Sequence, residues 1–203
     1  MRHGWTRFFR IASALLLVCL PSQAVLGSSL SPAHVRQESA DSHRFDELTL
    51  AGLRPGRDVI AKAERLLSKP SGIGDNGISR TWQDPCRHEL LSIIADSRGT
   101  ILEIRVSEVG LASRESCGDS GPNRWATGHG REIGNSCPRA LALYGQPNSR
   151  GPSTKGGQQL ELLYYAFDWA GPDVPQVMEV LCTPDRDGKP GRVVEITLAA
   201  PSL

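Results

Sequence analysis

One sequence pattern constrains this chain of 203 residues more than any other: a passage of turn and helix residues occurs twice. The first copy reads LTLAGLRPGRDVIAKAERLLSKPS (48–71), and the second reads WATGHGREIGNSCPRALALYGQPNS (125–149). At one constant spacing, Thr49, Gly52 and Gly56 align with Thr127, Gly130 and Gly134. The two copies share turn residues rather than overall identity, which is the pattern that an old internal duplication leaves.

Each copy predicts one short helix, over 59–67 in the first and 137–144 in the second. Asp58 and Ser136 align with each other, and we expect each to cap its helix by accepting a bond from an early backbone N–H. Prolines then prevent each helix from continuing, because proline cannot supply the backbone donor that the next turn needs.

Three strands are expected after each helix, over 78–84, 89–96 and 101–108, and then over 160–169, 177–183 and 192–199. In the third strand of each copy, apolar residues alternate with polar ones and are expected to face the core: Leu102, Ile104, Val106, Val194, Ile196 and Leu198. The polar residues between them are expected to face water: Glu103, Arg105, Glu195 and Thr197. The sequence therefore predicts an α+β fold of two tandem units, each a short helical segment followed by a three-stranded antiparallel meander.

The expected boundaries place the first unit at 45–109, a linker at 110–124 and the second unit at 125–203. Residues 1–24 resemble a secretory signal peptide, with a basic start and an apolar run too short to span a bilayer. We expect cleavage after Ala24, or after Gly27 as the alternative, and then a flexible polar leader over 25–44. An uncleaved anchor helix remains a second alternative. Export to the periplasm or the exterior follows from this segment.

Cleavage would remove three arginines and leave 20 basic and 22 acidic residues, a net charge of −2. A nearly neutral chain offers no electrostatic footprint for nucleic acid or for acidic lipid. No second apolar run reaches transmembrane length, so no transmembrane helix is expected after signal cleavage.

Four cysteines would remain after cleavage: Cys86, Cys117, Cys137 and Cys182. An even number in an exported chain predicts disulfides. On the expected strand, Cys182 shares a face with Met178 and should look toward the helix that Cys137 opens, so we pair these two cysteines. Cys86 and Cys117 form the other predicted pair. The cysteines lack the close spacing of metal ligands, and we predict neither a metal site nor a cofactor.

The letters GDSG around Ser120 match the surroundings of the nucleophile in chymotrypsin-like proteases. Such a protease needs a histidine and an aspartate placed far upstream in a long N-terminal half. Here the preceding meander holds only His88, without the residues that surround the protease histidine. We therefore interpret Ser120 as part of the linker and predict no catalytic residues.

The strand LELLYYAFDW (160–169) is apolar on both of its faces. One face has to cover the helix, and the other either packs against the sister unit or meets a partner protein. Tyrosine and tryptophan are typical anchors of protein interfaces. We take Tyr165, Phe167 and Trp169, together with Trp82, as a candidate partner surface.

The segment GNSCPRALALYGQP (134–147) resembles the helix signature of SmpA/BamE-like and β-lactamase-inhibitor-protein-like (BLIP-like) modules. Segment 56–70 is a weaker match, because it is one residue longer and has Ser68 where glycine is usual. In the inhibitor family two such units present a sheet surface to a partner protein, and in the BamE family one unit binds envelope partners. The resemblance implies binding and contributes no catalytic residues.

We therefore expect an exported, non-enzymatic protein-binding module of the cell envelope or extracellular space, inhibitor-like or assembly-factor-like. Its partner would be another protein of the same compartment, with no nucleic acid involved. Two alternatives remain open: a small secreted hydrolase that uses Ser120 or an acidic pair, and a purely structural envelope protein.

Overall fold

The computed structural model describes residues 45–74, 77–110, 125–167 and 176–200, all within one compact unit, Ser39–Leu203. The expected signal peptide and leader, Ser120 and almost all of the expected linker lie outside the described residues. No helix in the described part of the chain is long and apolar enough to cross a membrane.

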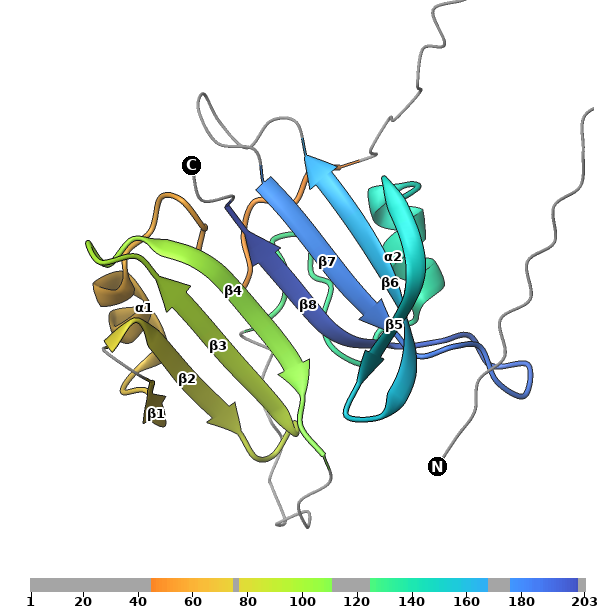
Figure 1. Ribbon diagram of the computed structural model, residues 1–203, viewed down its shortest axis with the longest axis horizontal. Coiled ribbons are helices and arrows are strands. Elements are labelled where there is room, and N and C mark those ends of the chain that lie inside the picture. Colours follow the sequence, from red (N-terminus) through yellow and green to blue (C-terminus); the bar gives the residue numbers. More distant parts are fainter. Residues whose placement is uncertain (1–44, 75–76, 111–124, 168–175, 201–203) are drawn as a thin grey trace, which may run out of the picture. The chain divides into compact units, whose positions relative to one another are not determined.

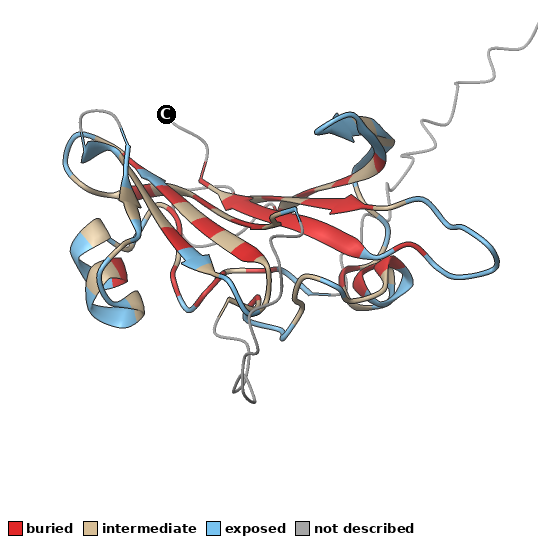
Figure 2. Ribbon diagram, turned by 90° about the horizontal axis from the view of Figure 1, so that it is seen from below, coloured by how far each residue is buried: buried red, intermediate tan, exposed pale blue. Residues whose placement is uncertain are grey.

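Eight antiparallel strands form a single sheet in the order β1–β2–β3–β4–β8–β7–β6–β5 (Figure 1). The first half of the chain contributes α1 (Ile60–Leu67), β1 (Gly72–Ile73), β2 (Ser79–Asp84), β3 (Glu89–Ala95) and β4 (Ile101–Glu108). The second half contributes α2 (Cys137–Tyr144), β5 (Ser149–Lys155), β6 (Gln158–Phe167), β7 (Gln176–Cys182) and β8 (Val193–Ala199). Both helices lie on the same side of this sheet (Figure 2).

The expectation of two tandem units, each a short helical segment and a three-stranded meander, is wrong. The strands β4 and β8 pair with each other, so both halves belong to one sheet, with Glu103–Ser107 running antiparallel to Glu195–Ala199. Each helix is also followed by four strands rather than three. The physical reason is that a separate meander would leave the N–H and C=O groups along its last strand unpaired. Here β4, the last strand of the first half, and β8, the last strand of the second half, pair with each other.

The strands β1–β4 of the first half occupy the same order, from edge to centre, as β5–β8 of the second half. Equivalent backbone hydrogen bonds also occur in both halves. Gly56 N donates to Ile101 O at 2.7 Å, and Gly134 N donates to Val193 O at 2.8 Å. The glycines of this pair take φ angles of 73° and 86°, a region that residues with a side chain rarely adopt. The aligned glycines therefore have the same structural use in both copies.

The two expected helix caps are not formed. α1 starts after Val59 and α2 after Ser136, and neither helix has a side-chain cap hydrogen bond. Val59 bridges Thr100 just as Ser136 bridges Arg192, so the structural counterpart of Ser136 is Val59 rather than Asp58. The first copy holds one extra residue before its helix. Asp58 instead accepts a bond from Arg54 N at 2.8 Å and pairs with Lys62.

The core lies between the sheet and the two helices. Its largest fully buried side chains include Tyr144, Tyr165, Phe167 and Met178. The expected alternation in the third strands holds for Ile104, Val106, Ile196 and Leu198, which are all buried in this core. It fails at Leu102 and Val194. The strand registers shift between Ile94 and Ala95 and between Leu181 and Cys182, opposite these two residues. Such bulges insert an extra residue and reverse the alternation locally.

The predicted disulfide between Cys137 and Cys182 is present, with a Cα–Cα distance of 6.2 Å. It joins the first residue of α2 to the last residue of β7, and both cysteines are buried. Cys86 is disulfide-bonded as well, while Cys117 lies outside the described residues, so the pairing of these two stays a prediction.

A buried carboxylate ties the start of the described chain to the second half. Glu47 is 1 % exposed. Its oxygens accept bonds from four backbone N–H groups and one phenol: Leu48, Thr49, Gly128 and His129, and the hydroxyl of Tyr144 at 2.7 Å. Burial, together with the neighbouring Glu47 carboxylate, raises the pKa of Tyr144 far above its ordinary value of 10.0. Burial raises the pKa of Tyr165 to about 12.

These two tyrosines predict how stability depends on pH. Their folded-state pKa values lie above 10.0, so their contribution to stability is complete below pH 10.0 and is lost as the pH rises beyond it. We expect the free energy of unfolding to fall above this pH by about 1.4 kcal/mol per pH unit for each tyrosine. Urea unfolding at successive pH values measures this slope. Tyr165→Phe should remove one tyrosine's share of it, and an unchanged slope in that variant would contradict the assignment.

The disulfide predicts a second loss of stability. Replacing both Cys137 and Cys182 by alanine should lower the free energy of unfolding by roughly 2–4 kcal/mol, because the unfolded chain is no longer restricted across this loop. Chemical unfolding of the double variant and of the oxidised wild type gives the difference. Equal midpoints would show that the bridge does not stabilise the fold.

Candidate functional site

Three of the four candidate partner residues are part of the core and cannot form a docking surface. Tyr165 and Phe167 are 0 % exposed and Trp82 is 4 % exposed. Tyr165 stacks on Phe167 with ring centroids 6.1 Å apart, and both rings contact Tyr144 of α2. Trp169 lies outside the described residues. These three aromatic side chains pack in the core, as most large aromatic side chains do.

The opposite side of the sheet is a different surface, which we call the open face (Figure 2). Side chains on a strand alternate between the two faces, so the core residues of each strand identify the residues that point away from the helices. Polar members of the open face lie on five neighbouring strands and include Thr81, Gln83, Ser92, Glu103, Arg105, Ser107, Glu179, Glu195 and Thr197.

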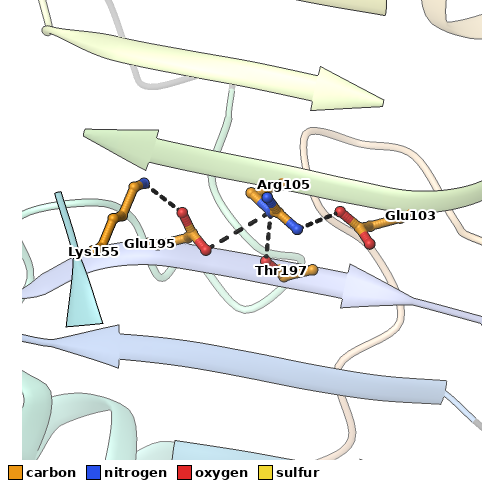
Figure 3. Close-up of polar contacts among 5 residues, drawn as sticks. All are labelled: Glu103, Arg105, Lys155, Glu195 and Thr197. Atoms are coloured by element: carbon orange, nitrogen blue, oxygen red, sulfur yellow. Dashed lines mark hydrogen bonds and ion pairs between the residues drawn. The ribbon is translucent and has the colours of Figure 1, made fainter. Parts of the chain in front are cut away.

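Arg105 lies at the centre of the open face, on the line where β4 meets β8. It pairs in register with Thr197, and its Nε donates to the Thr197 hydroxyl at 3.3 Å (Figure 3). One terminal nitrogen of the guanidinium lies 2.8 Å from Glu103 Oε1, and Nε lies 3.7 Å from Glu195 Oε1. Arg105 therefore joins carboxylates from both halves of the chain.

Glu195 is more deeply buried than Glu103 and Arg105. It is 9 % exposed, and its second oxygen lies 2.5 Å from Nζ of Lys155 (Figure 3). A carboxylate that loses most of its water needs ionic partners, and here it has one cation on each oxygen. We call Glu103, Arg105, Lys155, Glu195 and Thr197 the seam cluster.

Lys155 reaches β8 because the β5–β6 hairpin folds over the open face. The hairpin turns through Gly156 and Gly157, whose φ angles are 56° and 78°. Two positive φ angles are typical of the tight two-residue hairpin turn. Beneath the hairpin lies a second apolar cluster of Leu160, Leu162, Leu181 and Val194.

The sequence contained signals for part of this site. Two adjacent glycines ahead of an alternating strand are a strong indication of a hairpin, although Pro152 and the polar residues of β5 conceal its first strand. Glu103, Arg105, Glu195 and Thr197 were expected on a solvent-facing side of their strands. No sequence signal brings them together, because their contacts depend on the pairing of β4 with β8.

Each carboxylate of the seam cluster is paired with at least one cation. Glu103 and Glu195 both lie against the Arg105 guanidinium, so neither stands as an unpaired acid or base. The described residues contain no group of three or more His, Cys, Asp or Glu side chains that could hold a metal ion. What the cluster offers is two half-exposed cations, held by the nearly buried carboxylate of Glu195 and the partly exposed carboxylate of Glu103.

Comparisons with known proteins give two distant structural neighbours. One is a DUF4309 family protein, YjgB, from Bacillus subtilis subsp. subtilis strain 168, at 13% identity and a TM-score of 0.45, covering 76% of this chain and 88% of that chain. The other is a cysteine-rich secretory protein from Staphylococcus aureus subsp. aureus Mu50, at 12% identity and a TM-score of 0.33, covering 76% of this chain and 50% of that chain. No protein-family model and no curated protein matches the sequence.

At this level of similarity neither neighbour assigns a function. The resemblance of segment 134–147 to SmpA/BamE-like and BLIP-like modules is not tested by these comparisons and stays a hypothesis from the sequence.

The seam cluster predicts a measurable coupling between Lys155 and Glu195. A double-mutant cycle with Lys155→Met and Glu195→Gln should give a coupling energy of about 1 kcal/mol, because one partner is nearly buried while the other is still half-exposed. The pair of Arg192 and Glu108, whose side chains are 46% and 32% exposed, is the control and should give about 0.5 kcal/mol or less. Urea unfolding provides the seven stabilities that the two cycles need, because both cycles share the wild type. No coupling between Lys155 and Glu195 would mean that the ion pair does not hold the hairpin.

Proposed function

We propose that this protein is an exported, non-enzymatic binding module that recognises a partner protein through the open face of its sheet. The observation that carries the proposal is the seam cluster, in which ionic contacts fix the charged side chains at the middle of a face that the helices leave uncovered. Charges that are ordered before binding lose little conformational entropy when a partner arrives, and they select partners of complementary charge.

The location of the cluster supports the same function. Arg105 and Thr197 sit on the two central strands, which are flanked on both sides by paired strands and are therefore held in place by backbone bonds. The side chains of Arg105 and Lys155 are nevertheless 42% and 40% exposed, so a ligand can reach both cations. A rigid support with accessible polar groups is what specific recognition requires.

The buried disulfide supports the proposed compartment. Disulfides form and persist in oxidising compartments such as the periplasm and the exterior of the cell. We propose an inhibitor-like or assembly-factor-like role there, with another protein of the envelope or extracellular space as the partner.

Photo-crosslinking from single positions tests this proposal. A photoreactive amino acid placed at Ser92 or Gln83 on the open face should yield one discrete protein adduct in envelope or culture extract of the producing organism. The same amino acid at Arg65, exposed on α1 on the other side of the sheet, is the matched control and should not yield that adduct.

The charge of the seam cluster provides the second arm of this test. Arg105→Glu should abolish the adduct formed from Ser92, because it reverses the central charge that the partner contacts. An adduct that forms equally from Arg65, or that survives the charge reversal, would contradict recognition through the open face. The thermal midpoint of each variant shows that the fold is retained.

A further inference from the structure

The open face carries two equivalent positions, one of which the chain covers itself. In the second half, the register pairs Cys182 with Val193 and then Leu181 with Glu195, which leaves Val194 as the extra residue of a bulge. In the first half, Ala95 pairs with Ile101 and then Ile94 pairs with Glu103. Leu102 is the extra residue there. We call Leu181, Val194 and Glu195 the covered site. The equivalent residues in the first half are Ile94, Leu102 and Glu103, which we call the uncovered site.

The covered site shows what this kind of surface binds. The β5–β6 hairpin brings Leu160 against it, and Leu160, Leu181 and Val194 are then only 6%, 9% and 6% exposed. The same hairpin brings Nζ of Lys155 to 2.5 Å from Glu195. Two aliphatic side chains of the hairpin, Leu160 and Leu162, and one lysine, Lys155, thus contact an apolar pair and a carboxylate on the open face.

The uncovered site lacks this cover among the described residues. The corresponding edge strand, β1, is two residues long, Gly72–Ile73, so it makes no hairpin of comparable reach. Ile94 is 39% exposed, and Leu102 is half-buried and outside the main core. The cation on Glu103 is Arg105 of the same strand rather than a lysine delivered from above.

We infer that the uncovered site of Ile94, Leu102 and Glu103 binds a segment of the partner protein that carries two aliphatic side chains and a neighbouring lysine. The aliphatic groups remove the exposed Ile94 from water, which is favourable in proportion to the apolar area buried. The lysine complements the Glu103 carboxylate as Lys155 complements Glu195. This inference rests on the proposed function and adds to it the place on the open face and the chemistry of the ligand.

Selection of peptides against the mature protein tests the inference without knowledge of the natural partner. Random linear dodecapeptides displayed on phage are selected on wild type and depleted on the double variant Ile94→Asp/Glu103→Lys. The surviving peptides should carry a lysine or arginine near two aliphatic residues. Synthetic versions of them should bind at least tenfold more weakly to either single variant than to wild type.

Two matched variants on the other side of the sheet serve as controls. Ile73→Asp introduces the same charge at an isoleucine that is 65% exposed, and Glu64→Lys reverses a glutamate that also pairs with an arginine, Arg80. Both should bind the selected peptides as wild type does. Peptides rich in aspartate and glutamate, or peptides that bind wild type and the double variant equally, would overturn the inference. A selection without any differential binder would overturn it too.

The two proposals fail in different ways. If the adduct from Ser92 forms with the natural partner and persists in Ile94→Asp and Glu103→Lys, the proposed function stands and the ligand chemistry inferred here is wrong. If the selected peptides require Ile94 and Glu103 while no open-face position yields an adduct, the site binds this chemistry and the proposed recognition of a protein in the extract is wrong.

Discussion

The backbone ladder between β4 and β8 is the constraint on which the rest of the structure depends. It pairs the last strand of each half over Glu103–Ser107 and Glu195–Ala199, and it turns two four-stranded halves into one eight-stranded sheet. Without it, each half would expose an unpaired strand edge, which invites pairing with another chain. The ladder also places Arg105 beside Thr197, so the centre of the sheet and the centre of the charged cluster coincide.

A single sheet with both helices on one side divides the chemistry of the molecule between its two faces. One face holds the aromatic core, where Tyr144, Tyr165 and Phe167 contact each other and the disulfide fixes α2 to β7. The other face carries the seam cluster. The halves differ there because β5 has seven residues and β1 has two. The longer hairpin covers its own half, while the shorter strand leaves Ile94 accessible.

Local structure could be read from the sequence, whereas the joining of the halves could not. Both helices and six strands, β2–β4 and β6–β8, follow from apolar patterns and turn residues, and Cys137 was correctly paired with Cys182. The pairing of β4 with β8 uses backbone groups that every residue possesses, so no residue type indicates it. The prediction of a helix cap at Asp58 was wrong because the first copy has one extra residue before its helix, so that Val59 rather than Asp58 takes the position of Ser136. The aromatic surface failed because Tyr165, Phe167 and Trp82 serve the core, while the open face is built from separate polar residues that only the ladder brings together.

Residue-resolved hydrogen exchange of the backbone amides reports whether β4 and β8 are inner strands of one sheet. If they are, the β4 and β8 amides that point toward each other will be among the slowest to exchange and will open only with global unfolding. They should be slower than the amides of the edge strands β1 and β5. Amides of β8 that face β4 but exchange as fast as those of the edge strands would contradict a shared sheet, and the seam cluster would lose its support.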